Sequence, residues 1–343
     1  MHVPDGFIDA PVSAATGVVA AAAIAVSLRG ARRELDERTA PLAGLVAAFI
    51  FAVQMLNFPV AAGTSGHLLG GALAAILVGP YTGVLCVSVV LLMQGILFAD
   101  GGLTALGVNI TDMAITTTVV AYAVFRGLVK VLPRTRRSIT AASFTAALLS
   151  VPAAALVFTL LYALGGTTDV SLGKVATAMI GVHVLIGVGE AAITALTVGA
   201  VIAVRPDLVH GARGLEQRLK LRVNGELVDA PTRLEPAAAR GTSRRKLWIG
   251  GLVTSLLLAG FVSFYASSNP DGLEKVAADQ GIDRQTKEHA SADSPLADYG
   301  VRDVDDARLS GGLAGVIGVG VTVVAGTGVF WAVRKRRSTS QAA

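Results

Sequence analysis

The chain has 343 residues, of which 53% are hydrophobic and only 15% are charged. Soluble domains carry about 25% charged residues, so this composition indicates a protein embedded in a lipid bilayer. The net charge of +5 comes from Lys and Arg that lie between apolar segments, so it does not suggest a nucleic-acid partner. The single cysteine, Cys86, excludes a disulfide framework and a cysteine-based zinc site.

Nine apolar segments are predicted along the chain, seven before a polar break and two after it. The third segment is too short to cross a bilayer, which suggests a helix that starts below the membrane surface. The segments cover residues 11–28, 41–56, 67–79, 81–98, 103–125, 139–164, 175–204, 247–266 and 313–333. The sequence therefore predicts an all-α polytopic membrane protein, with a seven-helix bundle followed by two further transmembrane helices.

The orientation in the membrane follows from the basic residues. Most of the 29 Lys and Arg lie in alternate connections, at residues 29–38, 126–137, 205–246 and 334–337. Cytoplasmic loops are enriched in Lys and Arg, so we expect the N-terminus outside and the C-terminus inside a bacterial cytoplasmic membrane. The connection that precedes His67 is then also outside, which places His2 and His67 on the same side.

The first two residues offer three nitrogens to a metal ion: the Met1 α-amine, the His2 amide and the His2 imidazole. Imidazole is a natural ligand of Ni, Co, Cu and Zn, and the three nitrogens can form fused chelate rings. This requires that Met1 is retained, which we expect because His2 is bulky. The simpler alternative is a solvated terminal histidine.

His67 follows a glycine-rich stretch, residues 63–66, and begins the short third segment. Ionisable groups at membrane depth are rare and usually functional, although His67 could also cap a helix. With Met1 and His2 it would complete a set of four nitrogens. Such a planar set suits Ni(II) or Cu(II), is accepted less readily by Co(II), and does not suit tetrahedral Zn(II).

Several other polar side chains lie within or beside the apolar segments. Four of them could hold the ligands in place, or could simply hydrogen-bond between helices: Gln94, Asp100, Asn109 and Asp112. For Glu190 we expect only the second role, because it falls in the middle of a span. His183 is expected to lie deeper than the metal site.

Four stretches resemble the CbiM/NikM family, the substrate-capture subunits of energy-coupling factor (ECF) transporters for cobalt or nickel. They are residues 1–8 (MHVPDGFI), 66–71 (GHLLGG), 94–109 (QGILFADGGLTALGVN) and 187–194 (GVGEAAIT). The resemblance spans residues 1–205 and implies an ECF S-component-like bundle with metal ligands at Met1, His2 and His67. It also implies a transmembrane coupling (T) subunit and ABC ATPase (A) subunits as partners.

A second resemblance lies in the C-terminal part, where residues 269–277 (NPDGLEKVA) are similar to the motif of the small two-span N-type partner subunit. The chain thus resembles an M–N fusion, with a metal-capture domain at 1–205, a basic cytoplasmic linker at 206–246 and an N-type domain at 247–343. In this resemblance the acidic outer loop 267–310 helps metal to reach the site, with Asp271, Glu274 and His289 as candidates. An acidic, solvated loop is the alternative.

The expected function is therefore metal binding for import rather than catalysis. The chain has no phosphate-binding loop of the G-x-x-x-x-G-K-[ST] type, so partner subunits would have to hydrolyse ATP. A self-contained secondary transporter or channel for a divalent transition-metal cation is the alternative. The sequence leaves the choice between nickel and cobalt open, and no catalytic cofactor is expected.

Overall fold

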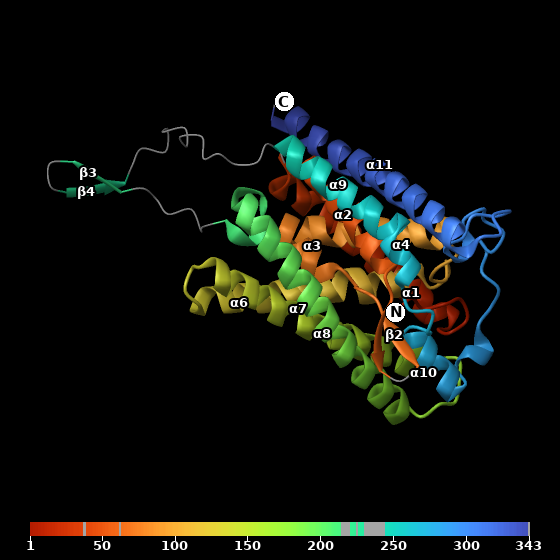
Figure 1. The fold of residues 1–343 in the computed structure, drawn as a ribbon. Helices are drawn as coiled ribbons and strands as arrows, with labels where there is room; N and C mark the ends of the chain where they lie inside the picture. Colours follow the sequence, from red (N-terminus) through yellow and green to blue (C-terminus); the bar gives the residue numbers. More distant parts are fainter. Residues whose placement is uncertain (37–38, 62, 214–219, 224–225, 230–243, 342–343) are drawn as a thin grey trace.

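The computed structural model describes residues 1–343 apart from 37–38, 62, 214–219, 224–225, 230–243 and 342–343. Long helices run side by side in a bundle, with the N-terminus and the C-terminus toward opposite ends (Figure 1). Much of the basic linker predicted at 206–246 lies outside the described residues.

The seven apolar segments predicted in the first part all form helices. The second of these is followed by a short antiparallel hairpin of β1 (Phe58–Ala61) and β2 (Thr64–Gly66). The fifth forms one continuous helical rod, Leu106–Val131, in which residues 110–116 adopt a π-helix. The helices are α1 (Ala10–Glu34), α2 (Ala40–Gln54), α3 (Gly71–Val78), α4 (Pro80–Leu97), α5 (Leu106–Asn109), η1 (Ile110–Thr116), α6 (Thr117–Val131), α7 (Arg136–Gly165) and α8 (Leu172–Val204).

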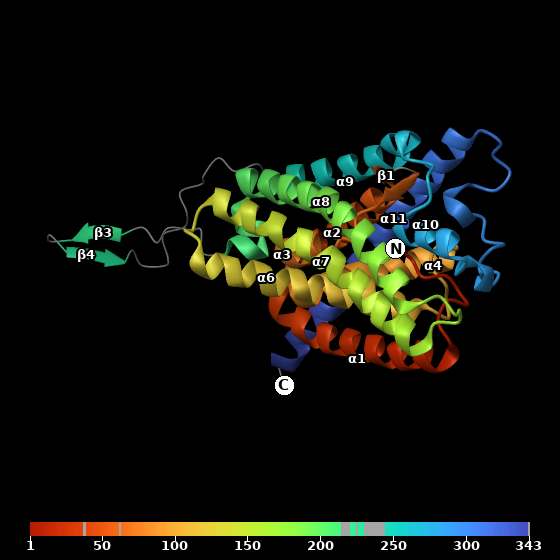
Figure 2. The ribbon, with the colours of Figure 1, turned by 90° about the horizontal axis from the view of Figure 1, so that it is seen from below.

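The C-terminal part adds two long helices to one side of this bundle. α9 (Arg244–Gly260) and α11 (Ala307–Gln341) pack against each other and against α2, and α1 lies on the opposite side from α9 (Figure 2). Between them the chain forms the helix α10 (Gly272–Gln280), which packs on α8 and on β2. A second hairpin, β3 (Lys220–Val223) with β4 (Glu226–Asp229), belongs to the connection before α9.

In the described part of the chain, seven helices are long and apolar enough to cross a membrane. The shortest of them, α4, has 18 residues, which at 1.5 Å per residue nearly matches a hydrocarbon core of about 30 Å. α2, with 15 residues, is shorter, and α3 has only 8 residues, in line with the predicted short third segment. These helices confirm the prediction of a polytopic all-α membrane protein.

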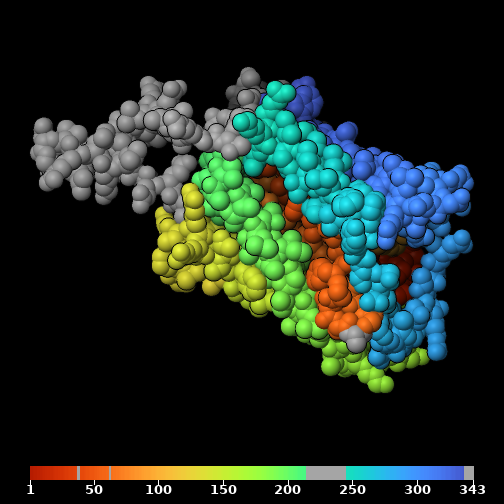
Figure 3. Space-filling view, viewed as in Figure 1, coloured from red at the N-terminus to blue at the C-terminus, as the bar shows by residue number. Residues whose placement is uncertain are grey.

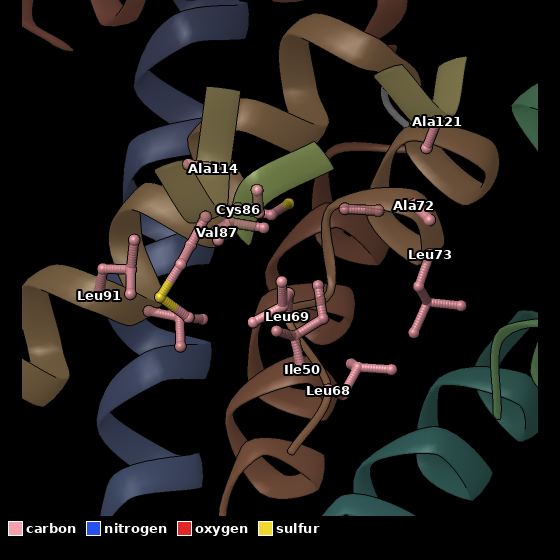
Figure 4. Close-up of a cluster of buried hydrophobic side chains, with 14 of the residues drawn as sticks. Ile50, Leu68, Leu69, Ala72, Leu73, Cys86, Val87, Leu91, Ala114 and Ala121 are labelled. Atoms are coloured by element: carbon pink, nitrogen blue, oxygen red, sulfur yellow. The ribbon is translucent and has the colours of Figure 1, made fainter. Parts of the chain in front are cut away.

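The interior next to the short helix α3 is built from small and aliphatic side chains. All residues of α3 are buried, as are Leu68 and Leu69 just before it. Figure 4 shows both leucines beside Ile50, with Cys86 in the same cluster. Inside a membrane bundle, close packing stabilises through many van der Waals contacts, so this pair anchors the backbone directly after His67.

Candidate metal centre

The N-terminal segment is threaded into the protein instead of being exposed to solvent. Met1 is only 2% exposed and Val3 is completely buried. Asn109 holds Val3 on both sides, since the Val3 N–H donates to Asn109 Oδ1 (2.7 Å) and Asn109 Nδ2 donates to the Val3 carbonyl (3.1 Å). Asp5 accepts a further hydrogen bond from the Thr104 N–H at 2.8 Å. The terminal amine therefore has a defined position.

The segment that carries His67 is fixed from the opposite side by α8. The Glu190 carboxylate accepts hydrogen bonds from the Leu69 N–H (2.6 Å) and the Gly70 N–H (3.1 Å). A Cβ at position 66 would lie 2.4 Å from Ile186 Cγ1, so glycine lets the turn pack directly on α8. Glu190 thus orders the turn that presents His67, in addition to joining two parts of the bundle.

The two segments meet at the His67 imidazole. The Met1 amine lies 2.5 Å from His67 Nε2, and the His2 and His67 rings are stacked with centroids 5.1 Å apart. His67 Nδ1 lies 3.1 Å from the Leu68 carbonyl. Because a carbonyl can only accept, Nδ1 carries the proton in this contact, and Nε2 keeps its lone pair toward the amine. A metal-binding imidazole is commonly fixed in this way.

The His2 imidazole is held by two of the predicted residues. His2 Nε2 lies 3.1 Å from Gln94 Oε1, and His2 Nδ1 lies 3.2 Å from Asp100 Oδ1. Asp100 in turn accepts a hydrogen bond of 2.5 Å from the Tyr299 hydroxyl. Burial lowers the pKa of His2 to about 4, against the opposing effect of Asp100, so the ring is neutral at pH 7. A neutral ring carries one N–H and donates to only one of these two oxygens, so its other nitrogen keeps a lone pair.

Asp271 reaches the same point from the C-terminal part of the chain. Its Oδ2 lies 2.6 Å from the Met1 amine and 3.4 Å from His67 Nε2. Its Oδ1 accepts the Glu274 N–H (2.9 Å), while Glu274 Oε2 accepts the Asp271 N–H (2.8 Å), which is a capping box at the start of α10. Burial would raise the pKa of Asp271, but the Met1 ammonium and His67 hold it well below its usual range.

The loop that carries Asp271 is hydrogen-bonded to β2, the strand that ends directly before His67. The Ser65 N–H donates to the Pro270 carbonyl (2.9 Å), and the Ser65 hydroxyl donates to the Asn269 carbonyl (2.8 Å). Farther along the loop, the Lys287 N–H donates to the Asp5 carbonyl (2.9 Å). The loop between α9 and α11 is therefore docked on both segments that supply the nitrogens.

A cavity of about 560 Å³ adjoins this cluster, between η4 (Val262–Tyr265) and the start of α11. Figure 3 shows a hollow between the cyan and blue C-terminal segments, with the dark red N-terminal segment visible inside it. The carboxylates of Asp100, Asp271, Glu274 and Asp298 line the cavity, together with the single cation of Arg308. An excess of carboxylates at the mouth of a site raises the local concentration of cations.

The structure brings Met1, His2 and His67 together, as the prediction of a metal site requires. One nitrogen each of His2 and His67 and one oxygen of Asp271 lie within 4.8 Å of one another, and this is the only such group with three or more candidate side chains in the described residues. Gln94, Asp100 and Asn109 make the contacts expected of residues that hold the ligands in place. Their role in metal binding stays a prediction.

Asp112 and His289 are not members of the ligand cluster, and their proposed roles around it stay predictions. Asp112 is completely buried, and its carboxylate makes no hydrogen bond to any described residue, the N-terminal segment included. It follows Asn109 by three residues, but residues 110–116 form a π-helix, whose wider turn breaks the shared helix face. His289 Nε2 lies 3.1 Å from the Gly101 carbonyl and fixes the loop to the backbone.

His183 is fully buried, its Nδ1 lies 2.8 Å from the Met179 carbonyl, and the ring is not a member of the cluster of His2, His67 and Asp271. Two features of the site escaped the sequence reading. Asp271 lies in direct contact with the Met1 amine, and Glu190 holds the His67 turn. The D-x-x-E spacing of Asp271 and Glu274 was an available signal for a capped helix.

Comparison with known proteins gives this geometry a context. Residues 2–208 match the CbiM family, described as the cobalt uptake substrate-specific transmembrane region, and residues 245–335 match the PDGLE domain. A protein of Haloquadratum walsbyi, named provisionally as a metal transport protein, is 39% identical over 209 residues, which cover 61% of this chain and 93% of that protein.

Two further similarities point the same way. The fused nickel transport protein NikMN of Rhodobacter capsulatus is 42% identical over 125 residues, 36% of each chain. A crystal structure described as a transition metal transporter is 27% identical, has a TM-score of 0.52 and matches over 60% of this chain and 93% of its own. Its long apolar helices and its family make the chain a multi-pass membrane protein of metal transport rather than an enzyme. The chain belongs to the CbiM family and carries a PDGLE domain in its C-terminal part.

Proposed function

We propose that the chain is the substrate-binding component of an ECF-type importer and that it captures Co(II) or Ni(II) outside the cell. One observation carries this proposal: the Met1 amine and the imidazoles of His2 and His67 converge in a buried position at one end of the bundle. These are nitrogen donors, which divalent ions of the nickel and cobalt type prefer over the oxygen donors typical of Mg²⁺ or Ca²⁺ sites.

The proposed ligands form a compact set. The Met1 amine, the His2 amide nitrogen and His2 Nδ1 close fused chelate rings, and His67 Nε2 supplies the fourth nitrogen. His2 Nδ1 lies 3.2 Å from Asp100 Oδ1, so this nitrogen would exchange the Asp100 contact for the bond to the ion. The acidic cavity beside the cluster supports capture of a cation from the aqueous side.

The proposed orientation places this end of the bundle outside and the C-terminus in the cytoplasm. The basic residues within 29–33, 126–137 and 334–335 lie at the ends of helices that run away from the metal centre, which agrees with the enrichment of Lys and Arg in cytoplasmic loops. We further infer a metal-capture domain at 1–205, joined by the linker 206–246 to an N-type domain at 247–343.

The proposed partners are a transmembrane coupling subunit and ABC ATPase subunits, which would drive release of the ion into the cytoplasm. The chain has no G-x-x-x-x-G-K-[ST] loop, so ATP hydrolysis is assigned to the ATPase subunits. The proposal predicts that transport of Co(II) or Ni(II), but not metal binding, depends on these subunits.

A metal titration with three histidine variants tests the proposed site. We expect His2→Ala and His67→Ala to lose tight binding of Ni(II) and Co(II) in competition with a chromophoric chelator, because each removes a nitrogen ligand. His210→Ala is the control, since it removes a partly buried imidazole that contacts Tyr122 and lies outside the cluster. Unchanged affinity in both His2→Ala and His67→Ala would overturn the proposal.

A further inference from the structure

We propose that Asp271 is itself a metal ligand, so that the C-terminal part of the chain completes the coordination of the ion. The inference rests on the proposed function, because it adds an oxygen donor to the nitrogens of Met1, His2 and His67. It goes further than a loop that attracts cations, since it assigns one carboxylate oxygen to one coordination position.

The distances among three donor atoms carry the assignment. The Met1 amine, His67 Nε2 and Asp271 Oδ2 form a triangle with edges of 2.5, 2.6 and 3.4 Å. With metal–ligand bonds of about 2.0–2.2 Å, two ligands at right angles lie about 2.9 Å apart. The triangle therefore has the size of one face of a coordination polyhedron. The Asp271 oxygen thus lies within reach of an ion held by the Met1 amine and His67 Nε2, as an added ligand beside the proposed nitrogens requires.

Among the carboxylates that line the cavity, only Asp271 groups with His2 and His67 in the described residues. Asp100 is engaged through both oxygens, one against His2 Nδ1 and one accepting the Tyr299 hydroxyl. Asp271 uses Oδ1 for the Glu274 N–H and directs Oδ2 at the Met1 amine. Asp271 is therefore poised to bind through one oxygen without breaking the cap of its own helix.

Charge favours the same residue. Met1, His67 and Asp271 are all less than 9% exposed, and a divalent ion at such a position is costly unless negative charges accompany it. A deprotonated His2 amide supplies one negative charge, and the Asp271 carboxylate supplies the second. The buried complex is then formally neutral.

The test uses the full chain with Asp271→Asn and Asp271→Ser, because Asn and Ser both cap helices well while neither carries a carboxylate. We expect each variant to bind Ni(II) and Co(II) at least about tenfold more weakly than the unaltered chain, a loss in the range known for residues around metal sites. Asp279→Asn is the control, since it removes an exposed carboxylate from the same helix that pairs with Lys275 and does not line the cavity, and it should bind as tightly as the unaltered chain.

X-ray absorption at the nickel edge gives a second readout that needs no variant. The unaltered chain should show a fifth, oxygen ligand, and Asp271→Asn should show the planar four-nitrogen signature. Unchanged or tighter metal binding in both Asp271 variants, or a planar spectrum in the unaltered chain, overturns the inference. His67→Ala separates the two proposals, because it abolishes binding if the proposed function holds, whether or not Asp271 is a ligand.

Discussion

Asn109→Ala tests whether the N-terminal segment has to be held in place for metal binding. The side chain touches none of the proposed ligand atoms, but it makes two hydrogen bonds to the backbone of Val3, two residues after the terminal amine. Each such bond contributes about 0.5–1.5 kcal/mol net, so the pair contributes about 1–3 kcal/mol to the ordered segment. A tenfold change in affinity corresponds to about 1.4 kcal/mol.

We therefore expect Asn109→Ala to weaken Ni(II) binding by about 5- to 150-fold, from the same free energies, with an unchanged stoichiometry. The assay is a competition titration of the purified chain against a chromophoric chelator. Thr116→Val is the matched control, because it removes a hydrogen bond to the Thr111 carbonyl in the same rod without touching the N-terminal segment. Affinity of Asn109→Ala within twofold of the control would refute the reasoning.

Two further predictions concern stability. Glu190→Leu leaves the buried N–H groups of Leu69 and Gly70 without their acceptor, at a cost of about 1–3 kcal/mol each. The melting temperature of the metal-free protein should therefore fall by several degrees, and an unchanged melting temperature would contradict the role of Glu190 as an anchor. Burial, with smaller effects of Arg213 and Arg126, lowers the pKa of His210 to about 4, below the unfolded value of about 6.5. Protonation of His210 therefore favours the unfolded state, and the stability of the protein should fall as the pH is lowered from 6.5 to 4. His210→Gln should reduce this fall. An identical dependence of stability on pH in the variant and the unaltered chain would contradict the prediction.

The sequence was sufficient for the large features of the fold, because a membrane imposes long apolar helices. The predicted segment 41–56 corresponds to α2 at Ala40–Gln54, and the predicted short segment 67–79 contains α3 at Gly71–Val78. The alternation of basic connections also placed His2 and His67 at one end of the bundle, where the structure brings them together.

The finer arrangement of the site depends on contacts that no local pattern reveals. Asp271 is 270 residues from Met1, and its position follows from the docking of the loop on Ser65 and Asp5. Glu190 lies in the middle of a span, where a carboxylate usually joins helices, but the turn after His67 leaves two N–H groups that only this side chain satisfies. The π-helix at 110–116, which separates Asp112 from Asn109, also has no periodic signature in an apolar run.

The central claim is that the terminal amine of Met1 binds the metal, and one extension of the chain tests it directly. A single residue placed before Met1 converts the amine, now 2.5 Å from His67 Nε2, into an amide, while every side chain of the site remains. We expect the extended chain to bind Ni(II) and Co(II) as weakly as His67→Ala, with the melting temperature of the metal-free protein little changed. Affinity equal to that of the unextended chain would contradict the account.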